Sequence, residues 1–155
     1  MLKRIVSGAQ TGADRAALDA AISLGIPCGG WVPKGRLDEL GVIPAEYPNL
    51  VEAEDSVPDT RTRLNVRDSD ATVIFSHGPL FGGSLLTDQF ARELCRPCLV
   101  LDMTGQTVEQ AAIRLRQWFA ELELEVLNVA GPRASHDEGI YRAVFEVLRA
   151  AFETG

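Results

Sequence analysis

Residues 71–90, ATVIFSHGPLFGGSLLTDQF, contain the pattern that decides the fold class. The first six residues form a β-branched and aromatic run, which is typical of a buried strand. A loop rich in Gly and Pro follows, and Leu86, Phe90 and Leu94 then recur at helical spacing. A strand, a short loop and an amphipathic helix make one βα unit, the building block of a parallel sheet.

The same alternation of strand and helix recurs along the chain. Strands are predicted at residues 4–7, 26–31, 97–101 and 125–129, and helices over 14–24, after Thr107 and after Ser135. Thr107 opens the capping box TVEQ, and Ser135 is expected to cap the last helix. These units predict one α/β domain over residues 1–155, built on a mainly parallel sheet of five or more strands.

Residues 32–59 interrupt this pattern. They contain four prolines and two glycines and have no convincing periodicity. An unpatterned insertion of this length in a compact domain is usually functional, so we expect a lid-like loop over a binding site. The alternative is a surface meander with a short edge strand near residues 50–51.

Composition limits the class of protein. The chain has 155 residues, of which 46% are hydrophobic, and this suits one domain with its own core. Its formal net charge of −7 argues against broad binding to nucleic acid or to anionic membranes. No apolar run approaches the roughly 18 residues of a membrane span, and no secretory signal is evident. We therefore expect a cytoplasmic protein without nucleic-acid or membrane partners.

The cysteines and histidines give no strong chemical motif. The three cysteines are an odd number, so a disulfide framework is not expected. Cys95 and Cys98 form a C-x-x-C pair between a helix end and a strand start, whereas redox pairs use helix N-termini. Both are interpreted as buried structural cysteines, with redox chemistry as the alternative. His77 lies on a loop after a strand and is a candidate ligand contact, His136 is expected at a helix start, and no metal site is predicted.

Polar and Gly-rich segments follow the carboxyl ends of all five predicted strands. In an open parallel sheet these ends meet at one rim, where ligands bind. Two helix N-termini, after Gly12 and after Gly83, are expected to point into one crevice and attract an anion. The candidate ligand-binding residues are Gly8, Gln10, Thr11, Gly12, Trp31, Lys34, Arg36, Gly82, Gly83, Ser84, Thr87 and Arg133.

Individual roles follow from side-chain chemistry. Lys34, Arg36 and Arg133 would supply positive charge, although Arg133 could equally be a solvated loop residue. Trp31 would stack on a flat ring or, alternatively, pack under the 32–59 segment. The sequence contains neither a dinucleotide-binding fingerprint, nor a P-loop, nor a nucleophile elbow.

Two carboxylates are candidates for acid–base catalysis, Asp14 and Asp102. Asp14 is equally well explained as a first-turn helix acid in a capping box with Thr11. Arg15 is expected to pair with Asp19 on the helix surface.

Five ordered blocks resemble the bacterial molybdenum carrier family. They are SGAQTGADRAALD (7–19), GGWVPKGR (29–36), NVRDSD (65–70), GGSLLT (82–87) and NVAGPR (128–133). The resemblance implies a Rossmann-like three-layer α/β/α fold, related to cytokinin-activating phosphoribohydrolases and DNA-processing proteins. It also implies a nucleotide-like or pterin-phosphate ligand, with molybdenum cofactor held by the carriers, often as homo-oligomers.

The chain departs from the phosphoribohydrolases at one turn. Those enzymes place a glutamate three residues after the threonine of a P-G-G-x-G-T turn. Here Phe81 replaces the proline, the turn is one residue longer, and Phe90 stands three residues after Thr87. We therefore predict a binding or carrier protein for a small phosphorylated ligand, with molybdenum cofactor first and a nucleotide second, and with molybdoenzymes as candidate partners. The alternative is a nucleotide-processing hydrolase acting on nucleoside monophosphate derivatives.

Overall fold

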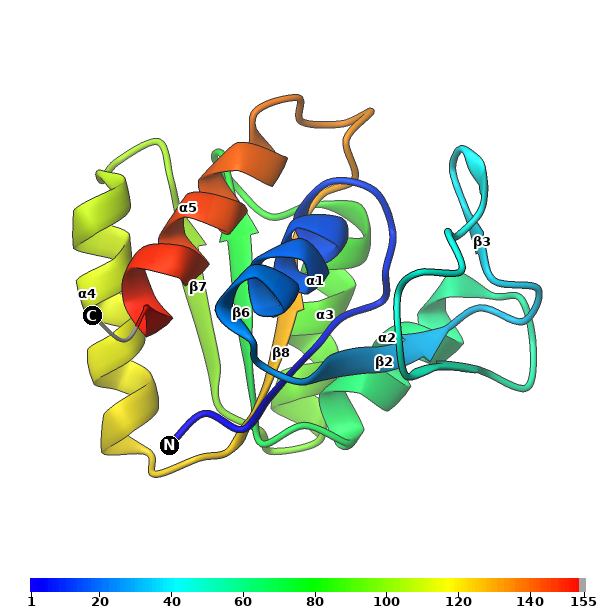
Figure 1. Ribbon diagram of the computed structural model, residues 1–155, viewed down its shortest axis with the longest axis horizontal. Coiled ribbons are helices and arrows are strands. Elements are labelled where there is room, and N and C mark those ends of the chain that lie inside the picture. The colour runs from blue at the N-terminus through cyan, green and yellow to red at the C-terminus, as the bar shows by residue number, and fades with distance from the viewer. Residues whose placement is uncertain (154–155) are drawn as a thin grey trace.

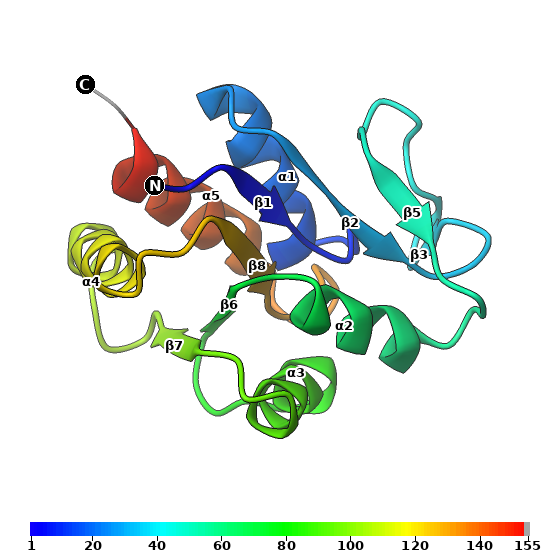
Figure 2. The same ribbon diagram turned by 90° about the horizontal axis from the view of Figure 1, so that it is seen from below.

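A computed structural model describes residues 1–153 and shows a six-stranded parallel sheet between two layers of helices (Figures 1 and 2). In spatial order the strands are β5 (Leu50–Glu52), β2 (Cys28–Val32), β1 (Arg4–Val6), β8 (Val126–Ala130), β6 (Ala71–Ser76) and β7 (Cys98–Asp102). The helices are α1 (Ala13–Leu24), α2 (Pro58–Arg67), α3 (Gly82–Glu93), α4 (Val108–Glu121) and α5 (Ile140–Phe152). The predicted α/β class, the three layers and the parallel sheet are confirmed.

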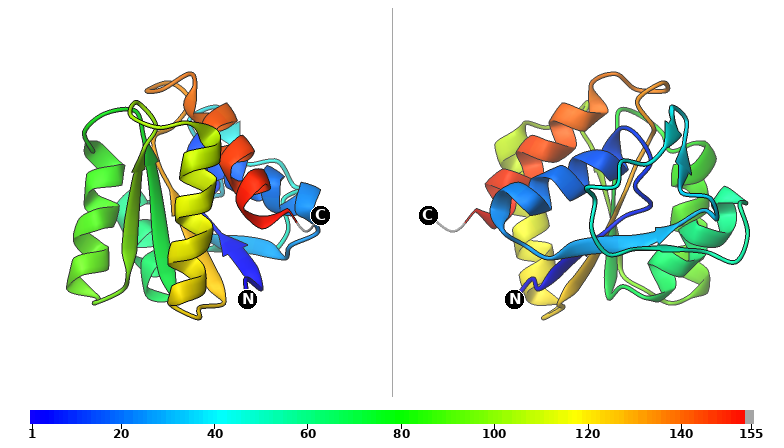
Figure 3. Two further views of the ribbon diagram at one scale, coloured as in Figure 1. Left: turned by 90° about the vertical axis from the view of Figure 1, so that its left-hand side faces the viewer. Right: turned by 45° about the vertical axis from the view of Figure 1, so that its right-hand side comes forward.

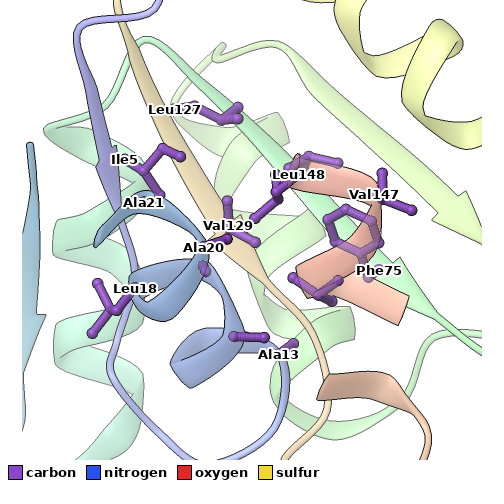
Figure 4. Packing of buried hydrophobic residues seen from close by; sticks show 14 of the residues in the cluster. Ile5, Ala13, Leu18, Ala20, Ala21, Phe75, Leu127, Val129, Val147 and Leu148 are labelled. Carbon is purple, nitrogen blue, oxygen red and sulfur yellow. The ribbon is translucent and has the colours of Figure 1, made fainter. Parts of the chain in front are cut away.

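The core lies mainly between the sheet and the layer formed by α1, α4 and α5, while α2 and α3 cover the opposite face (Figures 2 and 3). Buried alanines along α1 let this helix approach the sheet and α5 closely. Phe75, Leu127 and Leu148 fill the space beside them and are fully buried (Figure 4). Each such large side chain contributes roughly 1.5–3 kcal/mol on burial. No helix within residues 1–153 has the length and apolarity to cross a bilayer.

The segment 32–59 is structured along much of its length. It contains a small antiparallel hairpin of β3 (Leu37–Asp38) and β4 (Gly41–Val42), followed by the edge strand β5. The edge strand expected as the alternative near residues 50–51 is therefore present. The hairpin stands beyond the sheet edge (Figure 1).

Ion pairs and hydrogen bonds attach this segment to α1. Arg15 Nη2 lies 2.6 Å from Asp38 Oδ2, and the Tyr47 hydroxyl donates to Asp19 at 2.6 Å. The expected pairing of Arg15 with Asp19 is therefore wrong. The segment brings Asp38 to Arg15, while Asp19 accepts from Tyr47 and from Tyr141.

Local predictions at helix ends had mixed outcomes. The capping box at Thr107 is confirmed, with both reciprocal hydrogen bonds to Gln110. Ser135 does not cap α5, which begins at Ile140 after Gly139.

Cys95 is exposed rather than buried, because it lies in the turn that ends α3 with a φ of 54°. Cys98 is half-buried, and this burial raises the pKa of its thiol to about 12.

Candidate functional site

A pocket of about 190 Å³ opens at the carboxyl ends of β6 and β8. These neighbouring strands lead to helices on opposite faces of the sheet, since β6 continues to α3 and β8 to α5 (Figure 2). Such a reversal leaves a crevice, which is where parallel α/β sheets bind ligands. The walls come from the loop after β1, the start of α2, the start of α3 and the β8–α5 loop.

The N-terminus of α3 faces this pocket without an internal cap. Phe81 occupies the N-cap position and makes no side-chain capping bond. Across the described residues, the N–H groups of Gly82 and Gly83 have no hydrogen-bond acceptor. A Cβ atom at either glycine would meet nothing within 4 Å. The first turn of α3 thus brings free N–H donors and a positive dipole end to the wall of the pocket, an arrangement suited to an anion.

The N-terminus of α1 is closed, in contrast to that of α3. Ala13 N donates to Pro132 O at 3.1 Å, and a Cβ at Gly12 would lie 2.5 Å from the same oxygen. Only one of the two helix N-termini expected at the crevice is therefore available to a ligand. Gly12 serves close packing of the β8–α5 loop on α1.

Two arginines bring positive charge to the pocket. Arg133 lines it from the β8–α5 loop and forms no ion pair within the described chain. Arg61 reaches it from α2, where its Nη1 lies 3.7 Å from Asp14 Oδ2 and its buried Nε has no partner. Sequence reasoning missed Arg61, because its position depends on how α2 packs over the sheet. A Cβ at Gly8 would lie 2.3 Å from Arg61 Nη1, so Gly8 makes room for this arginine.

Three other candidates lie away from the pocket. Arg36 donates to the carbonyls of Ile43 and Pro44 and so braces the hairpin, and Lys34 is exposed outside the pocket. Trp31 donates from Nε1 to Asp68 Oδ2 at 2.9 Å and lines a separate hollow on β2. The positive charge at the pocket therefore comes from Arg61 and Arg133.

Of the two candidate carboxylates, Asp14 lies in the pocket. Its side chain is buried, and this burial raises its pKa to about 6, although Arg61 and the Gln10 N–H oppose the shift. Asp102 instead accepts hydrogen bonds from Gly78 N and from Thr104, which lower its pKa and hold the loop after β6. Of these two carboxylates, only Asp14 therefore lines the pocket.

We expect the stability of the protein to fall as the pH rises towards the folded pKa of Asp14. An acid with a higher pKa in the folded chain binds its proton more tightly there, so stability is lost between the unfolded pKa of 3.8 and the folded pKa of about 6. This difference corresponds to about 3 kcal/mol. The free energy of unfolding of Asp14→Asn minus that of the wild type should therefore rise by about 2 kcal/mol from pH 4 to pH 7, because the unfolded carboxyl is already partly ionised at pH 4. Urea unfolding at several pH values measures this difference, and parallel profiles for the two proteins would contradict it.

Glu39 of the hairpin, which sequence reasoning also missed, holds the rim of the pocket together. Its carboxylate accepts from Thr11 Oγ1 and, at 2.5 Å, from Ser135 Oγ, and these bonds lower its pKa. Gln10 Oε1 accepts from the N–H groups of Thr11 and Glu39, so the Gln10 side chain braces this loop while the residue lines the pocket. Thr11 therefore positions the loop that carries Arg133.

The remaining candidates lie at the start of α3 or on the β8–α5 loop. Ser84 and Thr87 line the pocket, and Thr87 Oγ1 donates to Gly83 O at 2.8 Å. His136 also lines it, with its ring 5.8 Å from that of Phe81. From the 32–59 segment, the pocket includes Pro58 and Asp59. Within residues 1–153, no three His, Cys, Asp or Glu side chains are grouped to hold a metal ion.

A parallel sheet between two layers of helices, with a pocket at the carboxyl ends of its strands, is a Rossmann-like fold. The model of the circularly permutated YpsA SLOG family matches residues 5–152, and the chain belongs to that family. It is also similar to a crystal structure described as "Putative molybdenum carrier protein" from Syntrophus aciditrophicus SB. That chain is 49% identical, has a TM-score of 0.95, and the match covers 97% of this chain and 95% of that one. No curated protein matches. The resemblance inferred from the sequence blocks is confirmed.

Proposed function

We propose that this protein binds and carries a small phosphorylated ligand, with the phosphate at the N-terminus of α3. The observation that carries this proposal is the pair of N–H groups at Gly82 and Gly83, which have no hydrogen-bond acceptor within the described residues and belong to the wall of the pocket. Arg133 lines the same pocket and can supply charge-assisted hydrogen bonds to phosphate. The first turn of α3 contains no acidic residue that would compete with an anion.

Two ligand classes fit a phosphate site of this kind, molybdenum cofactor and a nucleotide. The similarity to the molybdenum carrier structure supports the first. When bound, that cofactor brings its metal on an organic pterin phosphate, and Gly82, Gly83, Ser84 and Arg133 would hold the phosphate. We also propose that the protein acts in the cytoplasm as a homo-oligomer. In this proposal it supplies its ligand to molybdoenzymes.

Asp14 favours a second candidate function, a nucleotide-processing hydrolase. A buried carboxyl with a pKa of about 6 can exchange protons near neutral pH, as a general acid or base must. On nucleoside monophosphates this activity would release free base, and Asp14→Asn would abolish it. Base release measured by chromatography separates the hydrolase from the carrier.

The test of the carrier proposal has two parts. Mass spectrometry and metal analysis of natively purified protein should detect a phosphorylated small molecule. Titration with inorganic phosphate should then show that Arg133→Ala weakens binding by about 10- to 100-fold, the loss expected for a charge-assisted hydrogen bond. Arg142→Ala is the matched control, because Arg142 pairs with Glu146 on the exposed face of α5 and lies outside the pocket. Equal affinities for the wild type and Arg133→Ala would refute this phosphate site.

A further inference from the structure

A small compartment of about 40 Å³ adjoins the main pocket. The two spaces share Phe81, Ser84, Pro132 and His136 as walls. Some residues line the compartment but not the main pocket. Among them are Ser76, at the end of β6, and His77, which follows it. This volume suits one small polar group or one water molecule rather than a ring system.

Ser76 brings an unsatisfied hydroxyl to this compartment. The residue is 4% exposed, and its Oγ has no hydrogen-bond partner among the described residues. Buried hydroxyl groups are normally paired, because an unpaired one loses its hydrogen bonds to water without replacement. The Ser76 hydroxyl can donate a hydrogen bond to a bound group or accept one from it.

His77 is held in one orientation by Asp137. Its Nδ1 lies 2.7 Å from Asp137 Oδ2, and the other carboxylate oxygen accepts from Gly139 N at 3.1 Å. Because a carboxylate only accepts hydrogen bonds, Nδ1 carries a proton, and when the ring is uncharged Nε2 keeps its lone pair. Asp137 is therefore a positioning residue, and His77 offers a hydrogen-bond acceptor.

We infer that Ser76 and His77 form a subsite for a hydroxyl group of the ligand. A hydroxyl can accept a hydrogen bond from Ser76 Oγ and donate its own to His77 Nε2, so it satisfies both residues at once. The inference rests on the proposed function, because it places this hydroxyl beside a phosphate held at α3. The ligand class that carries both groups is the phosphate ester of a polyhydroxy compound, such as a pentose phosphate.

Calorimetric titration with AMP and its 2′-deoxy and 3′-deoxy analogues tests the subsite. The wild type should bind AMP about 10-fold or more tightly than one of the two analogues, since that analogue leaves both residues unpaired. In each of the variants Ser76→Ala and His77→Phe, the affinities for AMP and for that analogue should differ by no more than about twofold. Ser23→Ala is the control, because the Ser23 hydroxyl donates to Ala20 O on α1, outside both pockets.

Inorganic phosphate separates this inference from the proposed function. Both variants should bind inorganic phosphate with the affinity of the wild type. Ser76→Ala should not lower the Tm, because the substitution removes an unpaired hydroxyl. Equal wild-type affinity for all three nucleotides, or discrimination that survives in both variants, would overturn the subsite. Phosphate binding without AMP binding would overturn the subsite alone. If the wild type bound neither inorganic phosphate nor AMP, the phosphate site would be overturned as well.

Discussion

Replacing Gly83 by aspartate should abolish phosphate binding while making the folded protein more stable. The position lies in the first turn of α3 and a Cβ there meets no atom within 4 Å, so the side chain fits. Removing a helical glycine gains about 0.5–1 kcal/mol, and a first-turn acid adds about 0.3–1 kcal/mol. The same carboxylate would occupy the anion position. At about 4 Å, its repulsion of a phosphate charge is about 4 kcal/mol near a protein surface, which corresponds to a loss of roughly 100- to 1,000-fold in affinity.

Thermal unfolding and phosphate titration of the same samples measure the two effects. Gly83→Ala is the matched control, since it makes the same backbone change without the charge and should keep most of the affinity. If Gly83→Asp still bound phosphate within about threefold of the wild type, the anion site would lie elsewhere. A lowered Tm would mean that the start of α3 is more crowded than it is in the structure.

Replacing Gly12 by alanine should destabilise the protein by about 3–5 kcal/mol. Gly12 has a φ of 76° and a ψ of −127°, a conformation that side chains strongly disfavour. A Cβ there would also lie 2.5 Å from Pro132 O and 2.7 Å from Ala134 N. These atoms belong to the backbone of the loop that carries Arg133, so they can move only by displacing the loop. Urea unfolding measures the loss of stability.

Gly25→Ala is the control that separates backbone strain from crowding. Gly25 has a φ of 69° and a ψ of 22° at the end of α1, and nothing lies within 4 Å of a Cβ built there. Its substitution should cost only about 1–2 kcal/mol, the penalty for the left-handed conformation. Equal losses in the free energy of unfolding at Gly12 and Gly25 would show that crowding against the β8–α5 loop does not contribute to the destabilisation.

The sequence predicted those parts of the fold that depend on local pattern. The run 71–76 is buried on both sides, as expected for a central parallel strand, and its apolar character made it visible without any knowledge of its neighbours. The capping box at Thr107 was predictable because both partners lie within four residues. The expectation that the Gly-rich loops share one rim followed from the parallel sheet, since parallel strands end at one edge.

What could not be predicted depends on contacts between distant residues. Arg61 reaches Asp14 across 47 positions of the chain, and Glu39 reaches Ser135 across 96. Nothing in the local sequence of either residue distinguishes it from a solvated charge. Gly12 and Gly83 looked equivalent in the sequence, yet one is enclosed by Pro132 and the other faces open space. The packing of the β8–α5 loop makes this difference, because it encloses Gly12 and leaves Gly83 open.

The central position of β8 has a consequence for synthesis of the chain. β8 lies between β1 and β6, although it is the last strand of the sheet in sequence. Until residue 130 leaves the ribosome, the nascent chain can form only two separate half-sheets, β5-β2-β1 and β6-β7, each with an unpaired inner edge. Such edges are prone to pair with other chains. Formation of the pocket beyond the end of β8 is therefore tied to the last step of sheet assembly.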